Sequence, residues 1–555
     1  MSEKEWEFRV VSSLSKTYLD SGPTSGYMPD IHTAFVGEEY SFQVALRRTS
    51  SGSPTVISIA VDERSGPFTS FSEVVSVPCD VAAFAGHDSS YDRDTPGMYP
   101  DLLKPLLKGQ LTVSDNNWRA IWVDFTTESL KDAGKYTLHL EIMGEERETL
   151  LEHELQIEVL ESVLPPLGII NTHWFHCDGL ATYYGLKVFS EPHWKAIENF
   201  LQSARRISST AIMTPMWTPP LDTEVGSYRT PTQLIRIKKH GDKFSFDFSL
   251  LQRWIVLVKE LGFTYLEVPH LFSQWGAAFA PAFYLDEPGS TQPIFGWHTD
   301  SASIEYQDFL NQFLPKLVAF LSNSWDINNV IFHISDEPHG PDQLVSYQAA
   351  KNIVEKHISH LTVIDALSDF ELYKSKTVDF PVIANDAVEP FLDADIEKFM
   401  IYYCVAQNID VSNRFFALPS YRNRILGHQL FAFKVAGFLH WGFNFYNSKL
   451  SITPIDPFSD TTGSGAFPGG DTFLVYPGIN FEPWESIRFK VLAQAMNDYR
   501  AFSKLAELSS HALVKEYIDH DGKGGRLKFD AFSQDPEYYF TVRNQINREI
   551  MGHTQ

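Results

Sequence analysis

The feature that most constrains this fold is an alternation of strand-like and helix-like segments that begins after Pro165-Pro166. The eight apolar, strand-like segments are residues 168–178, 210–217, 263–272, 330–336, 361–367, 380–385, 400–405 and 437–446. The clearest amphipathic helical patterns between and after them are residues 194–207, 250–261, 304–321, 344–357, 421–435 and 484–508. Eight strand–helix units in one domain is the count of a (β/α)8 TIM barrel. We therefore predict a TIM barrel over residues 167–508.

The segments on either side of the predicted barrel follow different patterns. Residues 1–163 contain short alternating strand-like stretches, separated by Gly, Pro, Ser and Asp, as in a β-sandwich. Examples are residues 40–46, 56–61, 120–125, 135–142 and 154–160. Residues 509–555 mix helix-like and strand-like pieces and are predicted to form a small C-terminal cap. A chain of 555 residues is too long for one core, which agrees with this division.

Composition excludes several classes of partner. The net charge of −25 and the pI of about 5.1 give a surface that repels phosphate backbones and anionic lipid. No apolar run approaches the roughly 18 residues that a membrane-spanning helix needs. We therefore expect no nucleic-acid or membrane partner, and a neutral or cationic substrate. The sequence leaves the oligomeric state open.

The three cysteines, Cys79, Cys177 and Cys404, are far apart and form no CxxC pair. A disulfide framework or a zinc site is therefore not expected, and this usage is typical of a reducing compartment. The N-terminus, Met1-Ser-Glu-Lys-Glu-Trp6, is charged and lacks the apolar segment of a signal peptide. We expect a cytoplasmic protein.

Two adjacent acids end the fourth strand-like segment of the predicted barrel. The apolar run Val330–Ile334 leads to Asp336 and Glu337, and Pro338 then prevents the strand from continuing because it has no N–H. Catalytic groups of TIM barrels lie at this carboxyl end of the strands. Two carboxyl groups in one pocket can have their pKa values pushed apart, which gives one acid and one anion. The alternative is that these acids only cap the following helix.

The ends of the other predicted strands are rich in groups that bind sugars. Aromatic rings stack on the apolar faces of sugars, while His, Asn and Asp hydrogen-bond the hydroxyl groups. Two long segments on the same face, residues 274–303 and 447–483, are expected to form lids or walls. For any single Trp, core packing is as plausible as substrate binding. The candidate substrate-binding residues are His173, His176, Trp217, His270, Trp275, Tyr403, Trp441, Asn444 and Asp471.

Metal, phosphate and triad chemistry find little support in the sequence. The potential metal ligands are His173, His176, Asp178 and His270. His173 and His176 are three residues apart, which suits a helix better than a strand, and no HExxH motif accompanies the four residues. The Gly463-Ser-Gly465 segment lacks the Lys-Ser/Thr of a P-loop. No GxSxG elbow is present. We therefore expect no metal and no cofactor.

The carboxyl pair favours one kind of glycoside hydrolysis. An ordinary retaining glycosidase needs a nucleophilic carboxylate separate from its acid. In many barrel glycosidases this nucleophile lies at the end of the seventh strand. Here residues 403–408 contain no acidic residue, and Asp410 is the first one after the strand. The substrate's own 2-acetamido oxygen can replace the nucleophile. Asp336 would then stabilise the acetamido group, and Glu337 would act as general acid and then base.

Two alternatives remain open from the residues. A glycosidase acting on sugars without an acetamido group would need a different base, with Asp369 or Asp386 activating water. A non-catalytic carbohydrate-binding barrel would use the aromatic cleft without turnover.

Several motifs in combination resemble glycoside hydrolase family 123 and the related DUF4091 proteins. They are Pro96-Gly-Met-Tyr-Pro-Asp-Leu-Leu103, His333-Ile-Ser-Asp-Glu-Pro338, Gly437-Phe-Leu-His-Trp-Gly-Phe-Asn444, Phe473-Leu-Val-Tyr-Pro-Gly478, Glu485-Ser-Ile-Arg488 and Asn497-Asp-Tyr499. The resemblance spans most of residues 90–505. It implies a β-sandwich followed by a TIM barrel, and β-N-acetylgalactosaminidase activity by substrate-assisted retention. By motif, Asp336 would stabilise the acetamido group and Glu337 would be the acid/base.

The chain departs from the family pattern in two places. Gly470-Asp-Thr472 stands where the family usually has Gly-Asp-Gly, and the chain shows no secretion signal, which many relatives carry. The expected substrate is accordingly an amino-sugar oligosaccharide or glycoside, for example one imported into the cell.

Overall fold

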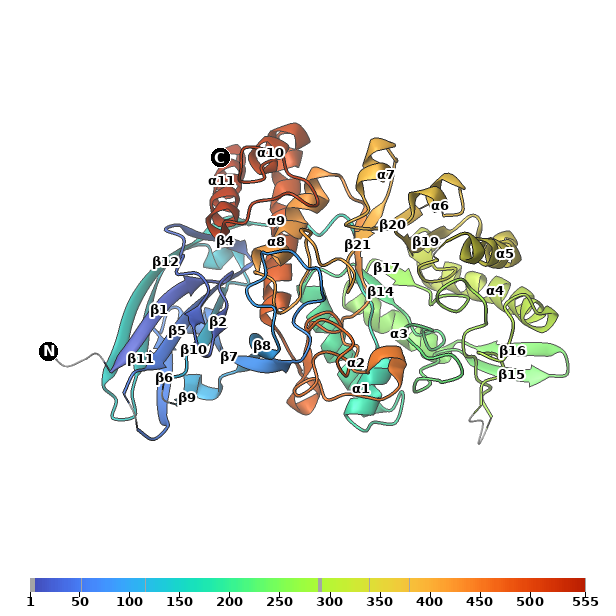
Figure 1. Ribbon diagram of the computed structural model, residues 1–555, viewed down its shortest axis with the longest axis horizontal. Coiled ribbons are helices and arrows are strands. Elements are labelled where there is room, and N and C mark those ends of the chain that lie inside the picture. The colour runs from blue at the N-terminus through green and yellow to red at the C-terminus, as the bar shows by residue number, and fades with distance from the viewer. Residues whose placement is uncertain are drawn as a thin grey trace.

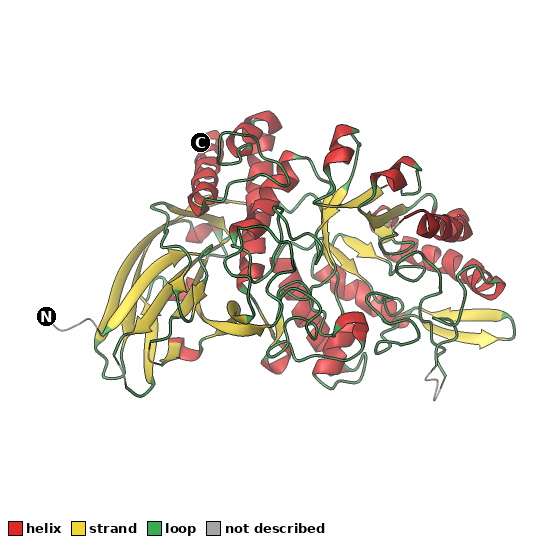
Figure 2. Cartoon of the chain, viewed as in Figure 1, coloured by secondary structure: helices red, strands yellow, loops and turns green. Residues whose placement is uncertain are grey.

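The computed structural model describes residues 5–50, 52–114, 116–287, 292–338, 340–378 and 380–554. Residues 1–4, part of the N-terminal segment in which no signal peptide is expected, lie outside this range, as do residues 288–291 of the long segment 274–303. A strand-rich domain and a larger domain of strands and helices lie side by side, and the C-terminal helices lie above the junction (Figures 1 and 2).

The N-terminal domain is the predicted β-sandwich. One sheet has the order β1 (Trp6–Ser12), β5 (Glu39–Arg48), β10 (Arg119–Thr126), β7 (Thr69–Cys79), β8 (Gly97–Pro105). The other has the order β4 (His32–Val36), β12 (Thr149–Val163), β11 (Gly134–Met143), β6 (Thr55–Val61), β9 (Gln110–Val113). Alternate side chains such as Val44, Ile121 and Leu138 fill the core between the sheets.

The second domain is a closed barrel of eight parallel strands, as predicted. In order around the barrel they are β13 (Ile170–His173), β14 (Ala211–Met213), β17 (Tyr265–Glu267), β18 (Val330–Phe332), β19 (Thr362–Leu367), β20 (Phe380–Ala384), β21 (Met400–Tyr402) and β22 (Gly437–His440). Each predicted segment contains one strand, but most strands are shorter than predicted. Their polar C-terminal residues leave the ladder and form the loops that carry the site.

Helices surround the barrel and cap the junction. They are α1 (Cys177–Tyr183), α2 (Glu191–Arg206), α3 (Ser249–Glu260), α4 (Ile304–Ser324), α5 (Gly340–Ile358), α6 (Phe370–Lys374), α7 (Glu389–Asp393), α8 (Tyr421–Ala432), α9 (Ile487–Leu508), α10 (His511–Ile518) and α11 (Pro536–Thr554). Two details correct the sequence analysis. The first strand does not reach residue 178, because α1 begins at Cys177, and the described part of the C-terminal segment contains helices and no strand. Among the described helices, none is both long and apolar enough to cross a membrane.

Three two-stranded pairs complete the set of strands. They are β2 (Thr17–Tyr18) with β3 (Gly22–Pro23), β15 (Arg236–His240) with β16 (Lys243–Asp247), and β23 (Tyr476–Pro477) with β24 (Pro483–Trp484).

Motif residues that are far apart in the sequence join the sandwich to the barrel. Asp101 on β8 accepts hydrogen bonds from Nε and Nη2 of Arg488 on α9, at 2.8 and 2.9 Å. The hydroxyl of Tyr476 donates to the same carboxylate at 2.6 Å. All three side chains are buried. These motif residues therefore hold the domains together rather than contacting substrate.

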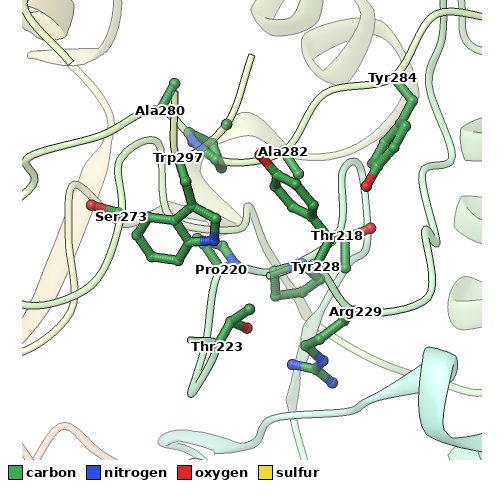
Figure 3. Close-up of a pocket in the computed structure, with 13 residues that line it drawn as sticks. Thr218, Pro220, Thr223, Tyr228, Arg229, Ser273, Ala280, Ala282, Tyr284 and Trp297 are labelled. Atoms are coloured by element: carbon green, nitrogen blue, oxygen red, sulfur yellow. The ribbon is translucent and has the colours of Figure 1, made fainter. Parts of the chain in front are cut away.

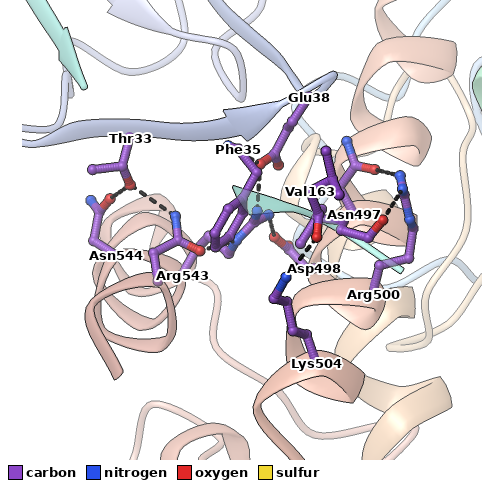
Figure 4. A network of polar contacts seen from close by, with 12 residues as sticks. Thr33, Phe35, Glu38, Val163, Asn497, Asp498, Arg500, Lys504, Arg543 and Asn544 are labelled. Atoms are coloured by element: carbon purple, nitrogen blue, oxygen red, sulfur yellow. Dashed lines mark hydrogen bonds and ion pairs between the residues drawn. The ribbon is translucent and has the colours of Figure 1, made fainter. Parts of the chain in front are cut away.

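A second buried network ties the C-terminal helices to both domains (Figure 4). Arg543 on α11 donates to Glu38 at 2.6 Å and to Asp498 on α9 at 3.0 Å. Asp498 also accepts from Arg424 on α8 at 2.8 and 3.1 Å. Burial alone would raise the pKa of Asp498, but Arg424 and Arg543 lower it below its usual value. Asp498 and Glu38 together neutralise the two buried guanidinium groups.

We expect Asp498→Asn to destabilise the protein strongly. The substitution leaves Arg424 and Arg543 with too little negative charge, and breaking a buried ion pair costs about 3–5 kcal/mol. Because the native pKa of Asp498 is lowered, its contribution is present above its ordinary pKa and is lost as the pH falls through the native value. Denaturant unfolding at pH 7 measures the loss. Glu371→Gln, which removes the exposed pair Lys374–Glu371, is the control and should cost under about 1 kcal/mol.

Candidate active site

A cavity of about 660 Å³ lies at the carboxyl ends of the barrel strands. The lining residues come from the C-terminal ends of several strands and from the loops that follow the strands. They are Trp174, Leu221, Asp222, Gln274, Trp275, Asp336, Glu337, Ala366, Tyr402, Cys404, Val405, Leu439, Trp441 and Phe467. The cavity therefore lies on the face where the sequence predicts the catalytic pair.

Asp336 and Glu337 lie in the turn that follows β18. Both are half-buried and line the cavity. The backbone N–H of Trp275 donates to the carbonyl oxygen of Asp336 at 2.9 Å, which ties this turn to the loop after β17. Glu337 has a φ of 40° and Trp275 a φ of 56°, a region that residues other than glycine rarely adopt. Such strain is found where a fold must aim particular side chains.

The electrostatics of this pair follow from burial and from mutual repulsion. Burial and the nearby charge of Glu337 raise the pKa of Asp336 well above its usual value, while His333 opposes them. A side-chain hydrogen bond links Tyr402 to Glu337, and burial together with this carboxylate raises the pKa of Tyr402. Repulsion between two adjacent carboxyl groups pushes their pKa values apart. The pair can therefore supply one acid and one anion.

Asp222 is a third carboxyl group in the cavity, and the sequence analysis does not identify it. It lies in the loop after β14, where its carboxylate accepts from the backbone N–H of Leu450 at 2.8 Å. Burial raises the pKa of Asp222 to about 6, and its charge contributes to the raised pKa of Asp336. No strand-end motif marks this residue, because it is nine residues beyond β14 and its position depends on contact with the loop after β22.

Three tryptophans form aromatic surfaces around the carboxyl groups. Trp275 is 44% exposed, Trp441 is half-buried, and Trp174 is buried with its Nε1 donating to Glu267 at 3.1 Å. The Nε1 of Trp441 donates to Asp471 at 2.9 Å. Rings held by a hydrogen bond at one edge and open on one face are suited to stacking on a sugar.

Comparison with protein families identifies the class of enzyme. The family model described as "Glycoside hydrolase 123, catalytic domain" matches residues 174–505, which is more than half of the chain. The chain belongs to glycoside hydrolase family 123. The resemblance found in the motifs is thereby confirmed, and the protein is a glycoside hydrolase.

A solved structure agrees with this assignment at the level of the fold. A family 123 glycoside hydrolase from Clostridium perfringens, described in connection with glycolipid glycan hydrolysis, matches with a TM-score of 0.72 at 16% identity. The match covers 99% of this chain and 98% of that one. A β-D-glucuronidase from Dictyoglomus thermophilum matches at 9% identity with a TM-score of 0.34, over 90% of this chain and 98% of that one. No curated protein matches the chain.

Of the predicted site residues of this family 123 enzyme, Asp336, Glu337, Trp275 and Trp441 line the cavity. Three others lie behind Trp441. Asp471 accepts a hydrogen bond from the indole N–H of Trp441. Nε2 of His176 lies 2.8 Å from the backbone carbonyl oxygen of Trp441. Asn444 exchanges two hydrogen bonds with the backbone of His176. These three residues hold the Trp441 wall in place rather than lining the cavity.

The remaining predicted residues are buried away from the cavity lining. Trp217 packs against Phe283 and Phe313, and its Nε1 donates to the carbonyl oxygen of His270. His173 and Tyr403 pack around Phe438, behind β22. Tyr402, the neighbour of Tyr403, lines the cavity instead. Successive strand residues point to opposite faces, so the choice between the two tyrosines depended on the register of β21.

A smaller pocket lies beside the cavity. Figure 3 shows the side chains that line this smaller pocket. Asp222 and Gln274 face the main cavity, whereas their neighbours Thr223 and Ser273 face this pocket. Gln274 donates to the carbonyl oxygen of Thr223 at 3.3 Å. Arg229, which borders the pocket, is committed to Asp178 and His176. The lining also includes Pro219, Pro220, Tyr228, Ala280, Pro281, Ala282, Tyr284 and Trp297.

One group of three potential metal ligands occurs among the described residues. Ligand atoms of His270, His333 and Asp365 lie within 4.8 Å of one another below the cavity. Nε2 of His333 lies 3.1 Å from Glu267, and its Nδ1 lies 3.8 Å from Asp365. Two carboxylates against the two nitrogens of one ring form the surroundings of an imidazolium ion, and this group is best described as an ion-pair cluster.

Proposed function

We propose that this family 123 enzyme is an exo-acting β-N-acetylhexosaminidase of the β-N-acetylgalactosaminidase type. The observation that carries the proposal is the adjacent pair Asp336 and Glu337, which lies in an aromatic-walled cavity where burial and the charge of Glu337 raise the pKa of Asp336. A retaining mechanism assisted by the substrate needs one anion beside the acetamido group and one proton donor beside the leaving oxygen. An adjacent pair in which one carboxyl group is protonated and the other ionised would supply both.

The reaction would proceed in two steps. The acetamido oxygen attacks the anomeric carbon while Glu337 donates a proton to the departing glycosidic oxygen, which breaks the glycosidic bond and forms an oxazoline-type intermediate. Asp336 accepts a hydrogen bond from the acetamido N–H and stabilises the positive charge that develops there. Glu337, now a carboxylate, then takes a proton from water, and the hydroxide attacks the anomeric carbon. The configuration is retained, and Glu337 regains its proton.

Substrate binding would determine which of the two carboxyl groups, Asp336 or Glu337, carries a proton. In the free protein, burial and Glu337 raise the pKa of Asp336. A bound acetamido N–H would donate to the Asp336 carboxylate and favour its ionised form, since a hydrogen bond to the anion lowers a pKa. The proton would then reside on Glu337, beside Tyr402, where the leaving group needs it. Acid and anion would thus take their roles only with an acetamido sugar in place.

The substrate class follows from the cavity and from the net charge. Trp275 and Trp441 offer surfaces for sugar rings, and a net charge of −25 favours neutral glycans over anionic ones. We propose an amino-sugar oligosaccharide or the glycan of a glycolipid, in line with the description of the Clostridium perfringens enzyme. The three cysteines are free, which agrees with action in a reducing compartment such as the cytoplasm.

Paired aryl glycosides test this function directly. We expect turnover of aryl β-GalNAc, or β-GlcNAc, with little or no turnover of the matching 2-hydroxy sugars, because only the acetamido group can act as the nucleophile. A thiazoline mimic of the bicyclic intermediate should inhibit competitively. Equal rates on 2-hydroxy sugars and no inhibition by the thiazoline would contradict the proposal.

One observation supports a second candidate function. Asp222 is a cavity carboxyl group with a raised pKa, so it could act as the base of a glycosidase that needs no acetamido group. The structure places the bases considered from the sequence elsewhere. Asp369 caps helix α6, and Asp386 accepts a hydrogen bond from Gln407, and neither lines the cavity. Turnover of 2-hydroxy sugars that Asp222→Asn abolishes would favour this candidate.

A further inference from the structure

A buried ion-pair cluster lies in the barrel below the catalytic pair. His333, at the end of β18 and three residues before Asp336, is 1% exposed, and its carboxylate partners Glu267 and Asp365 are fully buried. Its Nε2 lies 3.1 Å from Glu267 and its Nδ1 3.8 Å from Asp365. Carboxylates are almost never found at this depth unless a positive charge or several hydrogen bonds compensate them. His333 is the cation that compensates both.

The two carboxylates are in turn fixed by neighbouring elements. Glu267 on β17 accepts hydrogen bonds from Thr172 on β13 and from Nε1 of Trp174, which lines the cavity. The cluster therefore connects three barrel strands with one wall of the substrate cavity.

Asp365 on β19 makes the connection to the catalytic turn. It accepts from the backbone N–H of Ile334 at 3.1 and 3.2 Å, and from the hydroxyl of Tyr347 on α5. Ile334 is two residues before Asp336. An Asp365 side chain that moved would release both the backbone of β18 and the ring of His333.

We propose that His333 is a positioning residue whose charged ring, held between Glu267 and Asp365, orients the turn carrying Asp336 and Glu337 and keeps Asp336 available as the anion. The proposal rests on the proposed function for the role of that anion. His333 would contact neither the substrate nor the reacting atoms. It would act through the positive charge that it places near Asp336.

The charges that face this cluster are consistent with the proposal. Burial lowers the pKa of His333, but Asp365 and Glu267 overcome it and raise the pKa to about 9. Another titratable neighbour is His270, whose ring centroid lies 4.6 Å away and whose pKa burial and the charge of His333 lower well below its usual value. Around Asp336, burial and the charges of Glu337, Asp365 and Asp222 raise the pKa, and His333 opposes them.

Isosteric substitutions with opposite charge effects test the proposal. Asp365→Asn removes a negative charge near Asp336, so the bell-shaped pH profile of kcat/KM should shift to lower pH by about half a unit to one unit. His333→Gln removes the positive charge, so the profile should shift to higher pH. The accompanying loss of kcat should be no more than about tenfold. The double variant His333→Gln/Asp365→Asn restores the net charge of the cluster and should return the profile close to that of the wild type. A purely structural role predicts lower activity without opposite shifts, and without this return.

A second readout requires no substrate and separates this inference from the proposed function. The ¹⁵N shifts of the His333 ring in the full-length protein should show an imidazolium through pH 8. A neutral ring at pH 7 would overturn the inference. If the enzyme turns over 2-hydroxy sugars instead, the proposed function fails, while the ¹⁵N result and the profile shifts on those sugars still test His333. His428→Gln, at a buried histidine with no carboxylate bonded to its ring, is the matched control and should leave the profile in place.

Discussion

Replacing Glu337 with glutamine should reduce kcat/KM on natural glycosides by about 10²- to 10⁴-fold, the usual contribution of general acid–base catalysis. Aryl substrates with a good leaving group, such as a dinitrophenolate, need little proton donation, so their first step should be far less affected. The residual rate on those substrates should then be limited by hydrolysis of the intermediate. Michaelis–Menten kinetics over a series of leaving groups of known pKa measures the difference, and the Brønsted slope should become steeper in the variant.

The contradictory outcome is an equal loss on all leaving groups, which would remove Glu337 from the role of acid. Asp222→Asn provides a matched comparison, because Asp222 is also a half-buried carboxyl group of the cavity. Whatever that substitution does to the rate, we expect it to act alike across the leaving groups, since Asp222 donates no proton to the departing oxygen. A circular dichroism spectrum and melting temperature near those of the wild type confirm that each variant is folded.

Replacing Asp336 with asparagine should reduce kcat on acetamido sugars by about 10²- to 10³-fold, as expected for loss of one preorganised electrostatic contact to the transition state. Asparagine has nearly the same shape, so substrate should still bind, and KM should change little compared with kcat. The loss should be similar for good and poor leaving groups, because ring closure by the acetamido group precedes or accompanies departure of either. This independence from the leaving group distinguishes Asp336 from Glu337.

Binding of the thiazoline inhibitor provides the cross-check for Asp336. The variant should bind the thiazoline much more weakly than the wild type does, because the inhibitor's positively charged ring interacts with the missing carboxylate. If Asp336→Asn kept its activity and its affinity for the thiazoline, the anion would have to be sought elsewhere. Asp222 is the carboxyl group of the cavity that would then be tested first.

Parts of the candidate site could be predicted because local sequence determines them. The apolar run before Asp336 makes a buried strand, Pro338 ends it, and the carboxyl ends of parallel strands meet on one face of a barrel. Those three facts are enough to place Asp336 and Glu337, the candidate catalytic pair, at the mouth of the barrel. Trp275 and Trp441, which follow strand ends in the same way, also line the cavity.

Other parts could not be predicted because they depend on register or on contacts between distant loops. Tyr402 rather than Tyr403 faces the cavity, and a shift of one residue in β21 would exchange them. Asp222 reaches the cavity through its bond to Leu450, more than two hundred residues away in the chain. His176, Asn444 and Asp471 are polar residues after strand ends, as substrate contacts would be, but they bind one another and the Trp441 region instead.

By itself, the sequence of this protein determined the succession of elements and the chemistry at the end of one strand, because hydrophobic periodicity and chain-breaking residues act over a few positions. The tertiary structure alone decided which polar residues line the cavity, which ones join the domains, as Asp101 does, and which histidine, His333, lies between two buried carboxylates. The physical reason is that burial and charge at a side chain depend on every neighbour within a few ångströms. Those neighbours come from all parts of a closed barrel.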